Sequence, residues 1–386
     1  MPTSVTAENR ADVRADVLAR LPLRDDLRDS TPYGAPQLDV PVRLNTNENS
    51  YDVPDEVIAA IVDAVRQQAK HLNRYPDREF TALREDLAAY LGHDLQADQL
   101  WAGNGSNEVL QQVLQAFGGP GRTALGFTPS YAMYPKISLT TGTAWVDGLR
   151  GRPEVAAGGP GSFDLDIDRT VEQIRRLEPE ITFLCSPNNP TGTALSLDVV
   201  VAAYEATDGI VVVDEAYVEF ARSGTPSALS LLPGRERLIV SRTMSKAFAL
   251  AGARVGYLAA DPAISDALRL VRLPYHLSSL TQAAARAALW HSDVLLDTVE
   301  LIKAQRDRIV EALLELGLAP AASDANFVLF GGLGDEKAIW RSLLSRGVLI
   351  RDSGLPGYLR VTAGTEAETT RFLDALADSL LDDPTP

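Results

Sequence analysis

The stretch SRTMSKAFALAGARVGY, residues 241–257, decides how the rest of this sequence is interpreted. It follows RLIV at 237–240, a short apolar run that predicts a buried strand. Lys246 stands among small apolar residues, and partial burial of an amine disfavours its charged form and lowers its pKa. Such an amine is a usable nucleophile. The alternative is a lysine that lays its stem on apolar surface and keeps its amine in water.

Two hydroxyls and a guanidinium accompany this lysine. Thr243 and Ser245 precede it, and Arg254 follows eight residues later. These groups suit a bound anion, and arginine is well matched to phosphate. A lysine beside a phosphate site is what pyridoxal phosphate requires, since the lysine attaches the cofactor and the other groups hold its phosphate. The stretch therefore predicts a pyridoxal 5'-phosphate site.

The composition excludes several classes of protein. With 386 residues, two domains are the default expectation. The net charge of −16 argues against a nucleic-acid-binding surface, which would be basic. The single cysteine, Cys185, permits no intrachain disulfide, which fits a reducing, cytoplasmic location. Neither a zinc-ligand cluster nor an apolar signal peptide or membrane-spanning run is evident, so no metal and no membrane partner is expected.

Short apolar strands alternate with amphipathic helices along the first three quarters of the sequence. This order predicts α/β layers around a largely parallel sheet. Expected strands cover residues 124–127, 181–185, 210–213 and 237–240, and expected helices cover 54–71, 80–91 and a long region from 278 to about 316. A second, smaller domain is expected from strands at 327–330, 348–351 and 358–362 and helices at 337–346 and 366–381.

Polar turns at the ends of these strands carry further candidates. Gly105, Ser106 and Asn107 open a helix, and a helix N-terminus is a ready phosphate site, although an ordinary capped helix would look the same. Tyr131 follows a Pro turn and could present its ring to a site or belong to the core. Asp214 ends an apolar strand, where a carboxylate is costly unless paired; a protonated pyridine nitrogen is a fitting partner.

Two arginines mark the C-terminal part. Arg351 and Arg360 each lie in or beside an apolar strand. A surface arginine on a strand is common, but two of them nine residues apart indicate a site for a substrate anion.

The combined motifs resemble the fold-type I pyridoxal-phosphate aminotransferases over about residues 21–380. The motifs are the Asn-Pro-Thr-Gly turn at 189–192, Asp-Glu-Ala-Tyr at 214–217, Ser-Lys-Ala-Phe-Ala-Leu-Ala-Gly at 245–252 and Leu-Arg-Val-Thr at 359–362. The Asn-Glu-Asn element at 47–49 points to the subgroup that acts on histidinol phosphate. The resemblance implies a large cofactor domain with a seven-stranded type of sheet at 46–285, a small domain at 286–386, and an arm at 1–45 that joins the small domain.

The resemblance also implies a role for each matching residue. Lys246 would attach the cofactor and shuttle a proton, Asp214 would pair with the pyridine nitrogen, and Tyr131 would stack on the ring. Other residues complete the expected cofactor and substrate sites: Asn188 and Tyr217 at the 3-oxygen of the cofactor, Gly105, Ser106, Asn107, Thr243, Ser245 and Arg254 at its phosphate, Tyr75 reaching the phosphate of a neighbouring subunit, Arg360 at the substrate anion, and Arg351, Tyr33 and Asn47 lining the pocket. The family has acidic residues after the glycine of the 103–108 loop, whereas this sequence has Ser106-Asn107. A homodimer with shared sites follows.

The implied reaction is a ping-pong exchange of an amino group between histidinol phosphate and 2-oxoglutarate, with L-glutamate as the other product, in histidine biosynthesis. An aromatic amino acid aminotransferase and a decarboxylase of a phosphorylated amino acid share this machinery. A regulator that senses the cofactor would need a DNA-binding module, which neither the acidic balance nor the first 45 residues supply.

Overall fold

A computed structural model of the chain describes residues 16–28, 30–151 and 163–382. The chain divides into two units, Met1–Pro36 and Gln37–Pro386, and each is described by itself. In the first unit, residues 16–20 are helical and a 3₁₀ turn, η1, covers Asp25–Leu27. Residues 1–15 of the expected arm lie outside the described residues.

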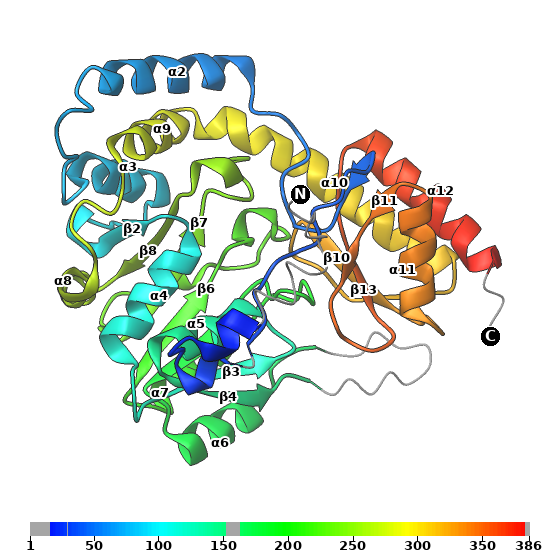
Figure 1. Cartoon of the computed structure of the whole chain (residues 1–386), viewed down its shortest axis with the longest axis horizontal. Helices are drawn as coiled ribbons and strands as arrows, with labels where there is room; N and C mark the ends of the chain where they lie inside the picture. Colours follow the sequence, from blue (N-terminus) through cyan, green and yellow to red (C-terminus); the bar gives the residue numbers. More distant parts are fainter. Residues whose placement is uncertain (1–15, 29, 152–162, 383–386) are drawn as a thin grey trace, which may run out of the picture. The chain divides into compact units, whose positions relative to one another are not determined.

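A seven-stranded sheet forms the centre of the second unit (Figure 1). Its strand order is β2-β8-β7-β6-β5-β3-β4. Only β8 runs opposite to its neighbours, so the predicted fold class, α/β with a mostly parallel sheet, is confirmed. The strands are β2 (Leu100–Gly103), β3 (Thr123–Thr128), β4 (Ala144–Leu149), β5 (Ile181–Cys185), β6 (Ile210–Asp214), β7 (Leu238–Thr243) and β8 (Gly256–Ala260).

The central strands are buried along their whole length because helices cover the sheet. Every residue of β5, β6 and β7 is buried, which explains why they read as continuous apolar runs rather than as alternating ones. The connecting helices are α4 (Ser106–Phe117), α5 (Met133–Thr141), α6 (Ile167–Leu177), α7 (Leu197–Glu205) and α8 (Pro262–Val271). The 3₁₀ turns η2 (Ala97–Gln99), η3 (Val218–Phe220), η4 (Ala228–Leu231) and η5 (Ala251–Ala253) complete these connections.

Three further helices pack together beside the sheet. They are α2 (Asp55–Ala69), α3 (Thr81–Leu91) and α9 (Ser279–Trp290), and α9 contacts both of the others (Figure 1). The long helical region expected from 278 to about 316 is two helices, α9 and α10 (Ser292–Glu315). They separate at His291, whose backbone angles of φ −118° and ψ 27° leave the helical region.

The C-terminal part contains two smaller sheets. A four-stranded antiparallel sheet has the order β12-β13-β10-β9, and a parallel pair joins β1 to β11. The strands are β1 (Val42–Arg43), β9 (Ala319–Pro320), β10 (Phe327–Gly331), β11 (Val348–Leu349), β12 (Arg351–Asp352) and β13 (Leu359–Thr362), and the helices are α11 (Glu336–Ser345) and α12 (Glu366–Asp382).

The prediction of one strand over 348–351 is wrong. Val348 and Leu349 pair with β1, whereas Arg351 pairs with β13 of the other sheet. The chain passes between the two sheets at the buried Ile350, whose carbonyl accepts a hydrogen bond from the Trp340 indole at 2.8 Å.

No helix within residues 16–28, 30–151 and 163–382 is both long and apolar enough to cross a bilayer. The division into domains at 45/46 and 285/286 stays a prediction.

Candidate active site

The candidate residues gather where three neighbouring parallel strands end. β5 ends at Cys185, β6 at Asp214 and β7 at Thr243, and each strand is followed by a polar turn. Ligands of open α/β sheets bind outside the carboxyl ends of the strands. These ends are therefore the place to test the predicted cofactor site.

Lys246 lies in the turn that follows β7. Its Nζ atom donates a hydrogen bond to the carbonyl oxygen of Thr46, at 2.9 Å. The pKa of this amine is lowered to about 8, chiefly by burial and also by the positive charges of Arg360 and Arg254, while the charge of Glu48 opposes the shift. The lysine is thus half-buried and readily deprotonated, as the sequence predicted for a nucleophilic amine.

Asp214 is buried at the end of β6. Its Oδ2 atom accepts a hydrogen bond from the Tyr134 hydroxyl at 2.7 Å, and its Oδ1 atom accepts one from the Ser241 hydroxyl at 3.1 Å. Burial raises the pKa of this carboxyl, and these two hydrogen bonds oppose the rise. Sequence reasoning missed Tyr134 and Ser241, because neither stands beside Asp214 in the sequence.

Tyr217 presents a buried hydroxyl next to the same strand end. It accepts hydrogen bonds from the amide nitrogens of Asn47 at 3.1 Å and Asn189 at 3.4 Å. Burial raises the pKa of this hydroxyl, and the charge of Arg360 and the bond from Asn47 lower it. Asn47, which was expected to line the substrate pocket, is buried with φ at 55° and is bonded to Thr362 as well.

The structure brings Asn189 to the Tyr217 hydroxyl, whereas Asn188, the residue predicted to contact the 3-oxygen of the cofactor, bonds to other groups. The Asn188 side chain is fully buried and points elsewhere. Its nitrogen donates to the carbonyl of Pro129 at 3.0 Å and to the Thr191 hydroxyl at 2.8 Å, and its oxygen accepts from the Ser130 hydroxyl at 3.0 Å. Asn188 therefore holds the turn together, and Asn189 replaces it as the candidate for contact with the cofactor.

A cradle suited to phosphate lies at the start of α4. Gly105 caps the helix with φ at 84°, a left-handed conformation that favours glycine. A Cβ atom on Gly105 would collide with the guanidinium of Arg254, and one on Gly256 would collide with the backbone of Ser106. Arg254 and the first-turn amides of α4 are therefore close together, as the sequence predicted for a phosphate site.

Arg254 is exposed and is aimed into this cradle. Within the described residues its only hydrogen bond goes to the carbonyl of Ala251, at 3.0 Å. Thr243 and Ser245 are buried nearby in the turn and share a hydrogen bond of 3.0 Å. On the other side, the Tyr131 hydroxyl donates to Asn107 at 3.1 Å, which brings the predicted stacking residue to the N-terminus of α4.

Arg360 is buried on β13 beside the turn that carries Asn189. Its guanidinium donates to the Asn189 side-chain oxygen at 2.5 Å and to the Asn45 carbonyl at 2.8 Å, and it lies 5.1 Å from the Phe327 ring centroid. Arg351 of β12 is its direct cross-strand partner. Opposite residues of an antiparallel pair project to the same face, so the two predicted anion-binding arginines share one face of the sheet.

Two predicted residues, Tyr75 and Tyr33, remain. Tyr75 is 80% exposed and stacks on Tyr275 with ring centroids 4.4 Å apart. Tyr33 lies in the first unit, and its place in the pocket stays a prediction.

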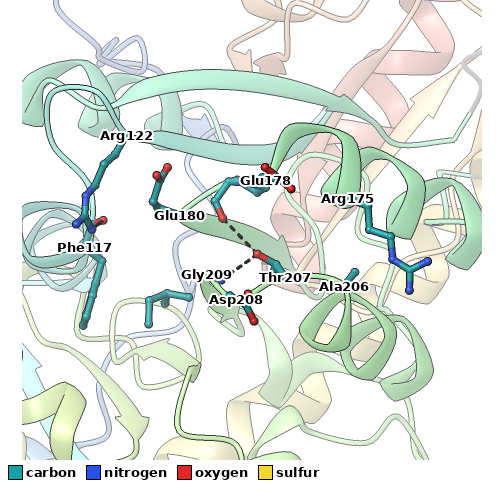
Figure 2. Close-up of a pocket in the computed structure, with 11 residues that line it drawn as sticks. Phe117, Arg122, Arg175, Glu178, Glu180, Ala206, Thr207, Asp208 and Gly209 are labelled. Atoms are coloured by element: carbon teal, nitrogen blue, oxygen red, sulfur yellow. Dashed lines mark hydrogen bonds between the residues drawn. The ribbon is translucent and has the colours of Figure 1, made fainter.

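A hollow of about 660 Å³ lies at the opposite ends of the strands (Figure 2). It is lined where β5 and β6 begin, by Ile210 among others, whereas Asp214 ends β6. Figure 2 shows Thr207 in its wall, with the hydroxyl donating to the Pro179 carbonyl at 3.3 Å and accepting from the Gly209 amide at 2.9 Å. This hollow contains none of the predicted site residues.

Comparison with known proteins places this geometry in one family. The family described as "Aminotransferase class I and II" matches residues 40–376. A histidinol-phosphate aminotransferase of Paenarthrobacter aurescens (strain TC1) is 64% identical over 95% of this chain and 97% of its own length, and one of Frankia casuarinae is 60% identical over 93% and 90%. A crystal structure of histidinol-phosphate aminotransferase from Sinorhizobium meliloti in complex with pyridoxal-5'-phosphate superposes with a TM-score of 0.77, at 27% identity over 89% of this chain and 92% of that one. The chain belongs to the class I and II aminotransferases.

Proposed function

We propose that this chain is a pyridoxal-phosphate-dependent histidinol-phosphate aminotransferase of histidine biosynthesis. It exchanges an amino group between L-histidinol phosphate and 2-oxoglutarate, giving imidazole-acetol phosphate and L-glutamate, or runs in reverse. Relatives that carry this name are 52–64% identical to the chain. The observation in the structure that carries the proposal is the half-buried amine of Lys246, whose pKa is lowered by burial and by the charge of the buried Arg360, together with the buried carboxylate of Asp214 at the end of the strand next to β7.

The residues present fit pyridoxal phosphate. Gly105 and Arg254 form a cradle that any larger residue at Gly105 would fill, and the start of α4 adds backbone amides and a positive helix end. Asp214 is a buried carboxylate, and the positive charge of a pyridinium nitrogen would offset the free-energy cost of burying its negative charge. When bound, the cofactor supplies an electron sink for the bonds at the amino-bearing carbon of the substrate.

Lys246 is the residue proposed to move protons. Its Nζ atom exchanges a proton near neutral pH because its pKa is about 8, so the same amine can accept a proton and return it. When the amine is free, the Thr46 carbonyl gives it a fixed resting contact at 2.9 Å. Lys246 is also the proposed point of covalent attachment of the cofactor.

Tyr217 and Asn189 are proposed to donate hydrogen bonds to the 3-oxygen of the cofactor. The Asn47 side-chain amide orients the Tyr217 hydroxyl by donating a hydrogen bond to it at 3.1 Å. Tyr131 is proposed to cover one face of the ring, and Thr243 and Ser245 to complete the phosphate contacts.

Arg360 and Arg351 are proposed to bind the anionic group of the substrate. L-Glutamate offers a carboxylate, which one guanidinium matches with two parallel hydrogen bonds. Histidinol phosphate carries a phosphate with more charge and more oxygens, and a second guanidinium is useful for it. The cross-strand pairing of Arg351 with Arg360 supports this division of roles.

A homodimer with shared sites is proposed as the working form, with Tyr75 reaching the cofactor phosphate of the partner. The 80% exposure of Tyr75 supports this role, because a side chain that reaches another subunit must leave its own. A cytoplasmic location is proposed as well, since a single buried cysteine suits a reducing compartment.

One assay tests the function against its nearest rivals. The purified protein is given 2-oxoglutarate together with histidinol phosphate or phenylalanine as the amino donor, and L-glutamate formation is followed with a coupled dehydrogenase. A higher kcat/KM for histidinol phosphate is expected. A preference for phenylalanine would indicate an aromatic amino acid aminotransferase. Release of carbon dioxide from a phosphorylated amino acid, with no L-glutamate formed from either donor, would indicate a decarboxylase.

A further inference from the structure

Each oxygen of the Asp214 carboxylate receives its own hydroxyl group. Tyr134 donates to Oδ2 at 2.7 Å from α5, and Ser241 donates to Oδ1 at 3.1 Å from β7. Ser241 is the direct partner of Asp214 in the register of β6 and β7. The two donors come from different elements and each holds a different oxygen, so together they fix both the position of the carboxylate and the plane of its oxygens.

Tyr134 is held too firmly for its hydroxyl to swing away. The side chain is 1% exposed. Its ring stacks on Phe183 with centroids 4.7 Å apart and an interplanar angle of 13°, and it meets the Tyr131 ring edge-on at 5.4 Å. The hydroxyl is therefore a preorganised donor, and no rotamer entropy is lost when it serves Asp214.

The surroundings of Asp214 favour its neutral form. The carboxyl is buried, and the charge of Glu215, the next residue, also disfavours its ionisation. Cys185 and Tyr217 face the same space without adding positive charge. A hydrogen bond to the charged form of a carboxyl favours that form, so the two hydroxyls act against burial.

We propose that Tyr134 and Ser241 are positioning residues that keep Asp214 ionised and aimed at the ring nitrogen of the bound cofactor. This inference rests on the proposed function, because it requires pyridoxal phosphate in the site. Each hydroxyl withdraws charge from the carboxylate and weakens its hold on a proton. The proton shared between Asp214 and the pyridine nitrogen then stays on nitrogen, where it makes the ring a stronger electron sink. Without the hydroxyls Asp214 becomes more basic and draws the proton to itself.

The test follows the ring nitrogen directly. The holoenzyme is prepared with pyridoxal phosphate labelled with ¹⁵N in the ring, and its nitrogen resonance is measured by NMR in the wild type, in Tyr134→Phe and in Ser241→Ala. Tyr134→Phe keeps the stacked ring and removes only the hydroxyl. Tyr257→Phe is the matched control, since Tyr257 of β8 is also fully buried but its hydroxyl lies among Arg242, Glu215 and Glu219.

Both variants are expected to move the resonance toward that of a neutral pyridine, and the double variant further. The Kd for the cofactor is expected to rise about tenfold or more in Tyr134→Phe, since a hydrogen bond to a charged group is lost. The control is expected to keep the wild-type resonance. A residue with a purely structural role would change stability without moving this resonance.

Unchanged resonances in both variants would overturn the inference. If Tyr134→Phe fails to fold, the ring-nitrogen resonance of Ser241→Ala is the test, and an unchanged resonance in that variant overturns the inference. A protein that does not bind pyridoxal phosphate gives a different result, because borohydride reduction of the wild type would then leave no labelled cofactor attached to Lys246.

Discussion

Replacing Arg351 by leucine tests how the pocket distinguishes a phosphate from a carboxylate. Arg351 lies directly opposite Arg360 in the antiparallel pair β12–β13. Opposite residues of such a pair have Cα atoms about 4.5–5.5 Å apart, so two guanidiniums can converge on one anion. Two like charges placed directly opposite are unfavourable in the absence of an anion, which is a reason to look for a ligand between them.

The size of the effect follows from one lost interaction. A hydrogen bond to a charged group contributes about 1.5–3 kcal/mol, and each 1.4 kcal/mol is a factor of about ten. Arg351→Leu should therefore lower kcat/KM for histidinol phosphate by about 10- to 150-fold. The loss for phenylalanine and L-glutamate should be much smaller, because Arg360 keeps its place through Asn189 and Asn45.

Steady-state kinetics with the three amino donors measure this difference. Arg341→Leu is the matched control, since Arg341 is an exposed arginine of α11 in the same part of the chain. A thermal-shift series with inorganic phosphate provides a second readout, in which the holoenzyme of Arg351→Leu should gain less in Tm than the wild type. Equal losses of kcat/KM on all three donors would refute the reasoning and make Arg351 a residue of the carboxylate site or of the fold.

Three further predictions concern the cofactor site and the assembly. Asn189→Ala should lower kcat and the affinity for pyridoxal phosphate. Asn188→Ala should chiefly lower Tm, because the Asn188 side chain bonds to its own turn and to a neighbouring one. The reverse pattern would restore Asn188 as the cofactor residue. Mixed dimers of Lys246→Ala with Tyr75→Phe should contain one site with both defects and one intact site, so activity should rise above that of either parent; a monomer by light scattering would contradict this. In the apoprotein, the Lys246 pKa of about 8 lies below the ordinary value of 10.5, so the unfolded chain binds the extra proton between these pH values and the free energy of unfolding should rise with pH there. Lys246→Met should lack this rise, and an identical rise in that variant would show that other groups cause it.

The strands and the lysine could be predicted because their signals are local. Ile181–Cys185 is a buried apolar run, and its bounds in the structure are those expected. Asp214 directly follows one such run and Lys246 lies in the turn after another, so a site at the strand ends was predictable.

Other features depend on contacts between distant parts of the chain. Asn188 and Asn189 are chemically identical neighbours, and only the path of the turn decides which one contacts Tyr217. The sequence did offer one signal for Asn189, because it stands directly before Pro190 and is the asparagine of the family's Asn-Pro-Thr-Gly motif. Tyr134 reaches Asp214 across 80 residues of sequence, and no local pattern distinguishes it from any other core tyrosine. The split of 348–351 between two sheets likewise depends on β1, about 300 residues earlier in the chain.

The short strap at 45–49 has a consequence for how this protein is synthesised. Asn45 and Asn47 are held by Arg360 and Thr362, and β1 pairs with β11. Domains form as units while the chain leaves the ribosome, but these partners are among the last to emerge. The strap is therefore synthesised long before its partners Arg360 and Thr362. Asn45 and Asn47, which are buried in the folded chain, stay exposed until those partners have been made. A chain that stops before Thr362 lacks the hydroxyl that holds Asn47, the residue next to the Thr46 carbonyl on which Lys246 rests.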